Sequence, residues 1–177
     1  MKRRDILRSG AGAAVMAVAG QARADTQIGA NMSTIPGDLQ KTIEQYHRAQ
    51  KEFVKGNPRP FKDLCSHADD VTIAGGMGGV QKGWAEVAKR YDWASARFAS
   101  DDDERHTESI SLVATPDLAY AVDIERSQVR VTGSAEVRPL ALRVTTVFRR
   151  ENGQWKLVHR HADPHVDVQP AAAMLRK

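Results

Sequence analysis

The sequence predicts an α+β domain in which helices come first and an antiparallel sheet follows. Apolar residues recur with helical spacing between residues 38 and 98, and runs rich in Val, Ile, Thr and Leu follow from residue 107. Elements that segregate in this way along a chain are typical of an α+β fold, with the helices covering one face of the sheet. A length of 177 residues suits one such domain.

Three helices are predicted before the sheet. The first begins at Asp38 and is closed by Gly56, and its apolar face consists of Leu39, Ile43, Tyr46 and Phe53. Pro58 and Pro60 open a short second helix. The third helix has the clearest amphipathic stripe in the chain: Trp84, Val87, Ala88, Tyr91, Ala94 and Phe98. Trp93 falls off this stripe, which favours a place at a rim or an interface.

The predicted strands surround a glycine-rich segment. "DDVTIA" is predicted to be a short strand, and "AGGMGGVQKG" after it a flexible loop. This loop matches no phosphate-binding motif, because Lys82 precedes Gly83 rather than Ser or Thr, and Gln81 replaces the third glycine of a dinucleotide motif. Four longer strands are predicted at 107–115, 118–131, 137–150 and 154–163, with turn signals between them at Pro116-Asp117, Gly133-Ser134 and Asn152-Gly153.

The N-terminus has the pattern of an export signal over residues 1–24. A basic head precedes a short apolar run, and Ala22-Arg23-Ala24 suits a signal peptidase. The pair Arg3-Arg4 resembles a twin-arginine signal. We therefore expect a periplasmic or extracellular protein, with a lead-in at 25–37, one domain at 38–165 and a tail at 166–177.

The charge of the chain limits its possible binding partners, and its cysteine content excludes an internal disulfide. The signal segment holds five of the 26 Lys and Arg and one of the 22 Asp and Glu, so the remainder has 21 of each and a formal charge of zero. We expect neither a nucleic-acid partner nor membrane attachment after signal cleavage. Cys65 is the single cysteine, so no disulfide forms within the chain, and we expect it to be a buried small hydrophobe.

Three segments resemble the SnoaL-like domain of the nuclear transport factor 2 (NTF2-like) superfamily. They are "HADDVTIAGGMGGVQKGWAEVAKRYDWASARF", "DLAYAVDIERSQV" and "LRVTTVFRRENGQWKLVHRHAD", within residues 38–165. The most specific part is the final hairpin, with Arg143, Thr145, Gly153, Trp155, His159 and His161. The resemblance implies a cone-shaped fold, a strongly bent sheet around helices, a central and largely apolar cavity, and dimers through the outer sheet face. Some members are isomerases, dehydratases, cyclases or hydrolases, so the fold implies a cavity rather than one reaction.

Two positions depart from the ketosteroid isomerase pattern within this resemblance. Gly75 falls where the catalytic carboxylate should be, and Ala49 falls near the position of the oxyanion-stabilising Tyr, three residues after Tyr46. A glycine cannot abstract a proton. The sequence therefore argues against isomerase activity of that kind.

The segment "LVHRHADPH" holds three of the six histidines. Strand alternation puts His159 and His161 on the face of Trp155 and Leu157, which predicts that both point towards the cavity, with Asp163 in the same row. Three interpretations follow. The pair could bind a metal, His161 could shuttle protons or contact a ligand, or both could cap the core without chemistry.

The predicted function is binding of a small, partly apolar molecule in a central cavity, without metal or cofactor. Two alternatives are a cofactor-independent lyase, isomerase or hydrolase, using His161 with Asp163 or Asp123, and a structural dimerisation module. The predicted ligand-binding residues are Trp84, Tyr91, Arg143, Thr145, His159 and His161. A homodimer is predicted through outward-pointing members of the set Val129, Val131, Val144 and Phe148.

Overall fold

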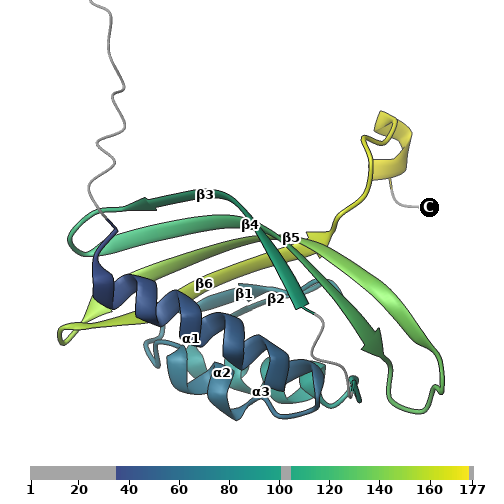
Figure 1. Ribbon diagram of the computed structural model, residues 1–177, viewed down its shortest axis with the longest axis horizontal. Helices are drawn as coiled ribbons and strands as arrows, with labels where there is room; N and C mark the ends of the chain where they lie inside the picture. The colour runs from purple at the N-terminus through teal and green to yellow at the C-terminus, as the bar shows by residue number, and fades with distance from the viewer. Residues whose placement is uncertain (1–34, 101–104, 176–177) are drawn as a thin grey trace, which may run out of the picture. The chain divides into compact units, whose positions relative to one another are not determined.

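A computed structural model describes residues 35–100 and 105–175 and confirms the α+β class (Figure 1). The helices are α1 (Gly37–Val54), α2 (Arg59–Leu64) and α3 (Trp84–Ser95), followed late in the chain by the short 3-10 turn η1 (Ala171–Met174). The strands are β1 (Thr72–Ala74), β2 (Val80–Lys82), β3 (Arg105–Ala114), β4 (Leu118–Arg130), β5 (Val137–Glu151) and β6 (Gln154–Pro164). The predicted signal peptide at 1–24 and most of the lead-in lie outside the described residues.

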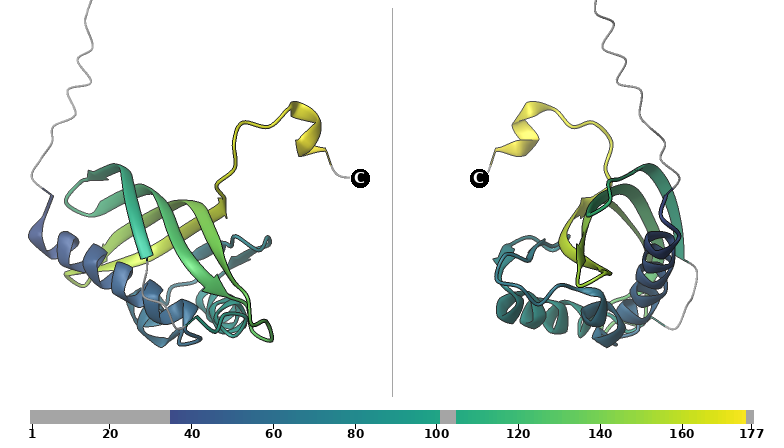
Figure 2. Two further views of the ribbon diagram at one scale, coloured as in Figure 1. Left: turned by 45° about the vertical axis from the view of Figure 1, so that its right-hand side comes forward. Right: turned by 90° about the vertical axis from the view of Figure 1, so that its left-hand side faces the viewer.

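The strands form one six-stranded sheet in the order β2-β1-β6-β5-β4-β3. Neighbouring strands are antiparallel except β1 and β6, which are parallel. Figure 2 shows that the sheet curls around the helices without closing into a barrel. The helices cover its concave face and leave the convex face open (Figure 2). None of the described helices is long and apolar enough to cross a membrane.

The glycine-rich segment contains a strand that the sequence analysis assigned to a loop. Gly78 and Gly79 both have positive φ, and the amide of Gly78 donates to the carbonyl of Gly75 at 2.8 Å. This turn folds β2 back onto β1. The prediction of a plain loop was wrong because positive-φ glycines also form hairpin turns.

The core lies between the helices and the concave face of the sheet. Its members are almost fully buried and include Leu39, Tyr46, Phe61, Val87, Phe148 and Leu157. Cys65 belongs to this core, as predicted, and burial raises the pKa of its thiol to about 12. The thiol is therefore protonated at neutral pH and behaves as a small apolar group.

A β-bulge in β6 reverses the side-chain alternation on which the histidine prediction rested. Phe148 pairs with Leu157 and Val147 pairs with His159, so Val158 is an extra residue in the ladder. Leu157 points inward before the bulge, and Arg160 points inward after it. The prediction that His159 and His161 share the inward face was therefore wrong.

The outer face of the sheet has a different set of apolar residues from the one predicted. Val129, Val144 and Phe148 point inward and are buried, and only Val131 of that set is exposed. Exposed apolar side chains of β3 and β4 are instead Ile110, Val113, Leu118 and Tyr120, with 57%, 43%, 50% and 42% of their surface accessible.

Candidate functional site

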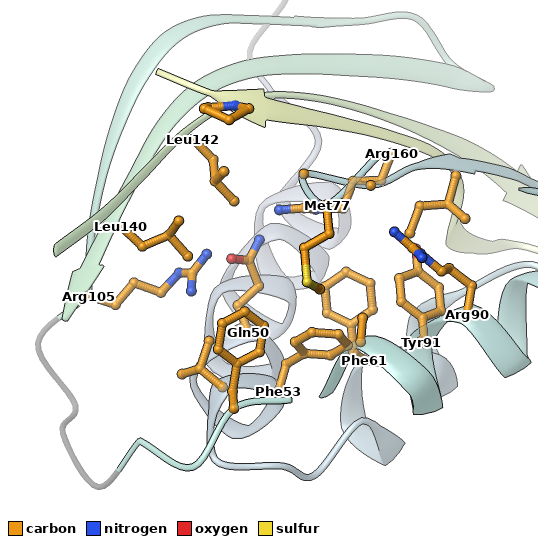
Figure 3. A pocket seen from close by; sticks show the side chains of 17 residues that line it. Gln50, Phe53, Phe61, Met77, Arg90, Tyr91, Arg105, Leu140, Leu142 and Arg160 are labelled. Atoms are coloured by element: carbon orange, nitrogen blue, oxygen red, sulfur yellow. The ribbon is translucent and has the colours of Figure 1, made fainter. Parts of the chain in front are cut away.

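A cavity of about 140 Å³ lies between the three helices and the concave face of the sheet (Figure 3). All three α-helices and the strands β1, β3, β5 and β6 contribute residues to its wall. The apolar part includes Phe53, Phe61, Ile73, Tyr91, Leu140 and Leu142. The polar part is small and includes Gln50, Arg105 and Arg160. This combination is typical of sites that bind small organic molecules, in which a few polar groups fix the orientation of an apolar ligand.

Buried Glu125 holds the polar part of the wall together. Its side chain, which projects from β4, is 1% exposed. Oε2 accepts hydrogen bonds from Nη2 of Arg105 at 2.6 Å and from Nη2 of Arg160 at 2.8 Å. Oε1 accepts from the hydroxyl of Tyr46 at 2.9 Å and from Nε2 of Gln50. The carboxylate thus joins α1, β3, β4 and β6, and its four partners offset the cost of burying it.

Electrostatic interactions keep the cluster formed by Glu125, Arg105 and Arg160 ionised. Burial alone would raise the pKa of Glu125, but the attraction of Arg160 and Arg105 and the hydrogen bonds from Gln50 and Tyr46 lower it below its ordinary value. Burial likewise acts to lower the pKa of Arg160, and the neighbouring Tyr46 and Glu125 raise it above its usual range. Burial lowers the pKa of Arg105, but a guanidinium stays charged at neutral pH, so this group of side chains contains two guanidinium ions and one carboxylate.

Two polar atoms of the cavity wall have no hydrogen-bond partner within the described part of the chain. They are Oε1 of Gln50 and Nε of Arg105, and both are buried. Buried polar atoms are nearly always paired in folded proteins. An unpaired acceptor and an unpaired donor in the same cavity wall indicate where a ligand's polar group can bind.

The predicted ligand-binding residues divide into one that lines the cavity and five that do not. Tyr91 is part of the wall. Trp84 stacks on His67 with ring centroids 4.0 Å apart, away from the cavity. Nδ1 of His159 lies 2.8 Å from the hydroxyl of Thr72. Thr145 pairs with exposed His161 across the β5–β6 ladder, on the outer face.

The proposed catalytic pair of His161 and Asp163 also lies on the outer face. Asp163 accepts from the guanidinium of Arg143, with Nε at 3.2 Å from Oδ1. Among the described residues, no group of three or more His, Cys, Asp or Glu is placed to hold a metal. A catalytic role for His161 and Asp163 stays a prediction, and it would have to be exercised outside the cavity.

Asp123, the alternative catalytic carboxylate, does point inward. It is 5% exposed, and burial raises its pKa to about 6. It does not line the cavity, although it shares the inward face of β4 with Glu125. Its place is therefore in the packed interior next to the polar cluster.

The two departures from the isomerase pattern occupy distinct places. Gly75 lines the cavity, and a Cβ on it would lie 3.1 Å from Nη2 of Arg90. A guanidinium thus fills the space beside the position where isomerases carry a carboxylate. Ala49 is buried in the core, and the nearby phenol of Tyr46 is bound to Glu125.

The sequence analysis did not identify the residues that form the polar part of the cavity wall or hold it together: Gln50, Arg105, Glu125 and Arg160. One signal was available for Glu125. The strand "LAYAVDIERS" alternates, so Glu125 shares a face with Ala119, Ala121 and Asp123, and the two alanines suit a packed interior. No comparable signal existed for Arg160, because its orientation depends on the bulge.

The curled sheet with helices on its concave face is the arrangement of the NTF2-like fold. The chain belongs to the SnoaL-like domain family, which matches it over residues 39–166. No curated protein matches the chain.

Solved structures support the same fold. An NTF2-like superfamily protein from Salmonella enterica subsp. enterica serovar Typhimurium str. LT2 is 16% identical, with 79% of this chain and 97% of that chain covered and a TM-score of 0.63. A ketosteroid isomerase-like protein from Erwinia carotovora atroseptica SCRI1043 is 16% identical, with 74% and 96% covered and a TM-score of 0.62. At this identity the likeness shows the fold alone.

Proposed function

We propose that this SnoaL-like protein binds a small, partly apolar molecule in the cavity between α1, α3 and the concave face of the sheet. The supporting observation is a space of about 140 Å³ whose wall is mostly aromatic and aliphatic, with Gln50, Arg105 and Arg160 on one side and Arg90 beside Tyr91 (Figure 3). An engineered cavity of similar volume, about 150 Å³, binds benzene in another protein. The ligand is accordingly about the size of a single substituted ring.

Toluene tests this proposal, because it fits such a volume and has no polar group. We expect toluene to bind the folded protein with 1:1 stoichiometry in a calorimetric titration and to raise its melting temperature. Ala94 lines the cavity, so Ala94→Leu should fill part of the space and weaken binding by at least about tenfold.

The matched control lies on the same helix. Ala85 is exposed and does not line the cavity, so Ala85→Leu should bind toluene like the wild type. Toluene binding that both variants keep unchanged would argue against an interior site.

Export is part of the proposal and rests on residues 1–24. The basic head, apolar run and Ala22-Arg23-Ala24 support cleavage before Asp25. N-terminal sequencing of the protein from the periplasm or medium should begin at Asp25. Replacing Arg3 and Arg4 by Lys should block export by the twin-arginine route and leave Sec export largely intact. Intact protein beginning at Met1 and confined to the cytoplasm would contradict export.

We further propose that the protein is a homodimer formed through the outer face of the sheet. The support is the group of exposed apolar side chains on β3 and β4, of which Tyr120 and Val113 face each other across the ladder. Contiguous apolar patches of this kind mark interaction sites on soluble proteins. A second copy would cover them.

A further inference from the structure

The two unpaired atoms in the cavity wall have opposite hydrogen-bonding capacity. Oε1 of Gln50 can only accept a hydrogen bond, and Nε of Arg105 can only donate one. Gln50 is 3% exposed and the Arg105 side chain 9% exposed, so bulk solvent does not reach them freely. Figure 3 shows both side chains at the same end of the cavity, opposite the aromatic rings near Tyr91.

The orientation of each group is fixed by Glu125. Nε2 of Gln50 donates to Oε1 of Glu125. Reversing the amide would put its oxygen against a carboxylate oxygen, so Oε1 is the atom left unpaired. Nη2 of Arg105 is held by Oε2 of Glu125 at 2.6 Å, which fixes the plane of the guanidinium and the direction of Nε.

A hydroxyl group satisfies both atoms at once, because it donates one hydrogen bond and accepts another. A carboxylate accepts only, so it would leave Oε1 of Gln50 unpaired. An apolar ligand would leave both atoms unpaired. The donor and acceptor pattern therefore selects a hydroxyl.

The rest of the wall selects a flat ring. The rings of Phe53 and Phe61 have centroids 5.6 Å apart, and those of Phe61 and Tyr91 4.9 Å apart, in tilted arrangements. All three line the cavity. Aromatic faces and edges of this kind pack well against a further aromatic ring.

We propose that the cavity binds a hydroxylated aromatic ring of the size of phenol. The hydroxyl donates to Oε1 of Gln50 and accepts from Nε of Arg105, and the ring packs against Phe53, Phe61 and Tyr91. This inference rests on the proposed function, since it names the chemistry of the ligand for the same cavity.

The test compares phenol, toluene and benzoate by calorimetric titration of the wild-type protein at neutral pH. An all-apolar cavity prefers toluene, because burying an unpaired hydroxyl is unfavourable. We expect the reverse here, with phenol bound at least about tenfold more tightly than toluene and also more tightly than benzoate.

The outcomes separate this inference from the proposed function. Toluene bound as tightly as phenol, or more tightly, would overturn the hydroxyl assignment and leave cavity binding intact. Benzoate bound more tightly than phenol would overturn it in favour of an anionic head group. Failure of all three probes would overturn both proposals.

Gln50→Met provides a second, independent measurement. Met keeps the length of the side chain but removes the acceptor, so the preference for phenol over toluene should fall to less than about threefold. Gln45 is exposed on the same helix, and Gln45→Met should keep the wild-type preference. A preference for phenol that survives Gln50→Met would contradict the proposed hydroxyl contact. If this variant does not fold, the comparison of phenol, toluene and benzoate on the wild type tests the hydroxyl contact.

Discussion

Arg160 and Glu125 meet in the interior of the domain, with Nη2 of Arg160 2.8 Å from Oε2 of Glu125, although 35 residues separate them in the sequence. The contact depends on the bulge at Val158, which turns Arg160 towards the concave face of the sheet. Without the extra residue, His159 and His161 would take the inward positions. The bulge therefore determines which polar groups border the cavity.

Replacing Glu125 by Gln should strongly destabilise the fold. The variant keeps the size of the side chain but leaves Arg105 and Arg160 buried without an opposing charge, which costs about 3–5 kcal/mol. The free energy of unfolding from urea denaturation measures this loss.

A surface pair provides the control for this change. Glu108 pairs with Arg126 at 2.7 Å on the exposed face of β3, so Glu108→Gln should change stability by no more than about 1 kcal/mol. Equal effects of the two changes would contradict a central role for the buried carboxylate.

The sequence predicted most of the secondary structure because its signals are local. The helical stripe from Trp84 to Phe98 and the hairpin at Asn152-Gly153 need only neighbouring residues to be recognised. Strand β2 is three residues long and follows two glycines, so its pairing with β1 is a tertiary effect. The same holds for the parallel pairing of β1 with β6.

The site was only partly predictable, for two physical reasons. Val158 is as good a strand residue as its neighbours, so nothing in the sequence marks it as the extra residue of a bulge. Glu125 carries a charge, and charged residues are rarely fully buried unless paired. Its partners Arg105 and Arg160 come from β3 and β6, so only the folded sheet brings the three together.

The raised pKa of Asp123 predicts that the stability of the fold depends on pH between about pH 4 and pH 6. Burial raises its pKa to about 6, above its value in the unfolded chain, so the folded state binds the proton more tightly. Its contribution to stability is therefore present below about pH 4 and is lost as the pH rises towards about 6.

Asp123→Asn should remove the loss of stability that the wild type shows between about pH 4 and about pH 6. The neutral amide has no charge to bury, so the variant should gain about 1–2 kcal/mol over the wild type at pH 7 and nothing below pH 4. Urea denaturation across this pH range measures the difference. An unchanged profile between pH 4 and pH 6 would show that Asp123 is not the titrating group.

His161→Ala should have little effect on either stability or binding. The side chain is exposed on the outer face, so its loss should cost less than about 0.5 kcal/mol. Toluene or phenol binding per folded molecule should stay at the wild-type value, because the ring does not line the cavity. A large loss of binding at an unchanged melting temperature would restore a functional role for His161.

Tyr120→Glu should disrupt the proposed homodimer. The side chain is 42% exposed on the outer face of β4, where a charge would oppose an apolar contact between two copies. Sedimentation at micromolar concentration should show a dimer for the wild type and a monomer for the variant. Ala85→Glu on the exposed side of α3 should remain a dimer, and a wild-type monomer would contradict the interface.

The location of a bound ring tests the central proposal most directly. Bromobenzene diffused into crystals of the protein marks its own position, because bromine scatters anomalously. We predict one strong anomalous peak inside the cavity of about 140 Å³, with the ring in van der Waals contact with Phe61 and Tyr91. Peaks found only on the outer face of the sheet, or none in the interior at saturating bromobenzene, would contradict the account.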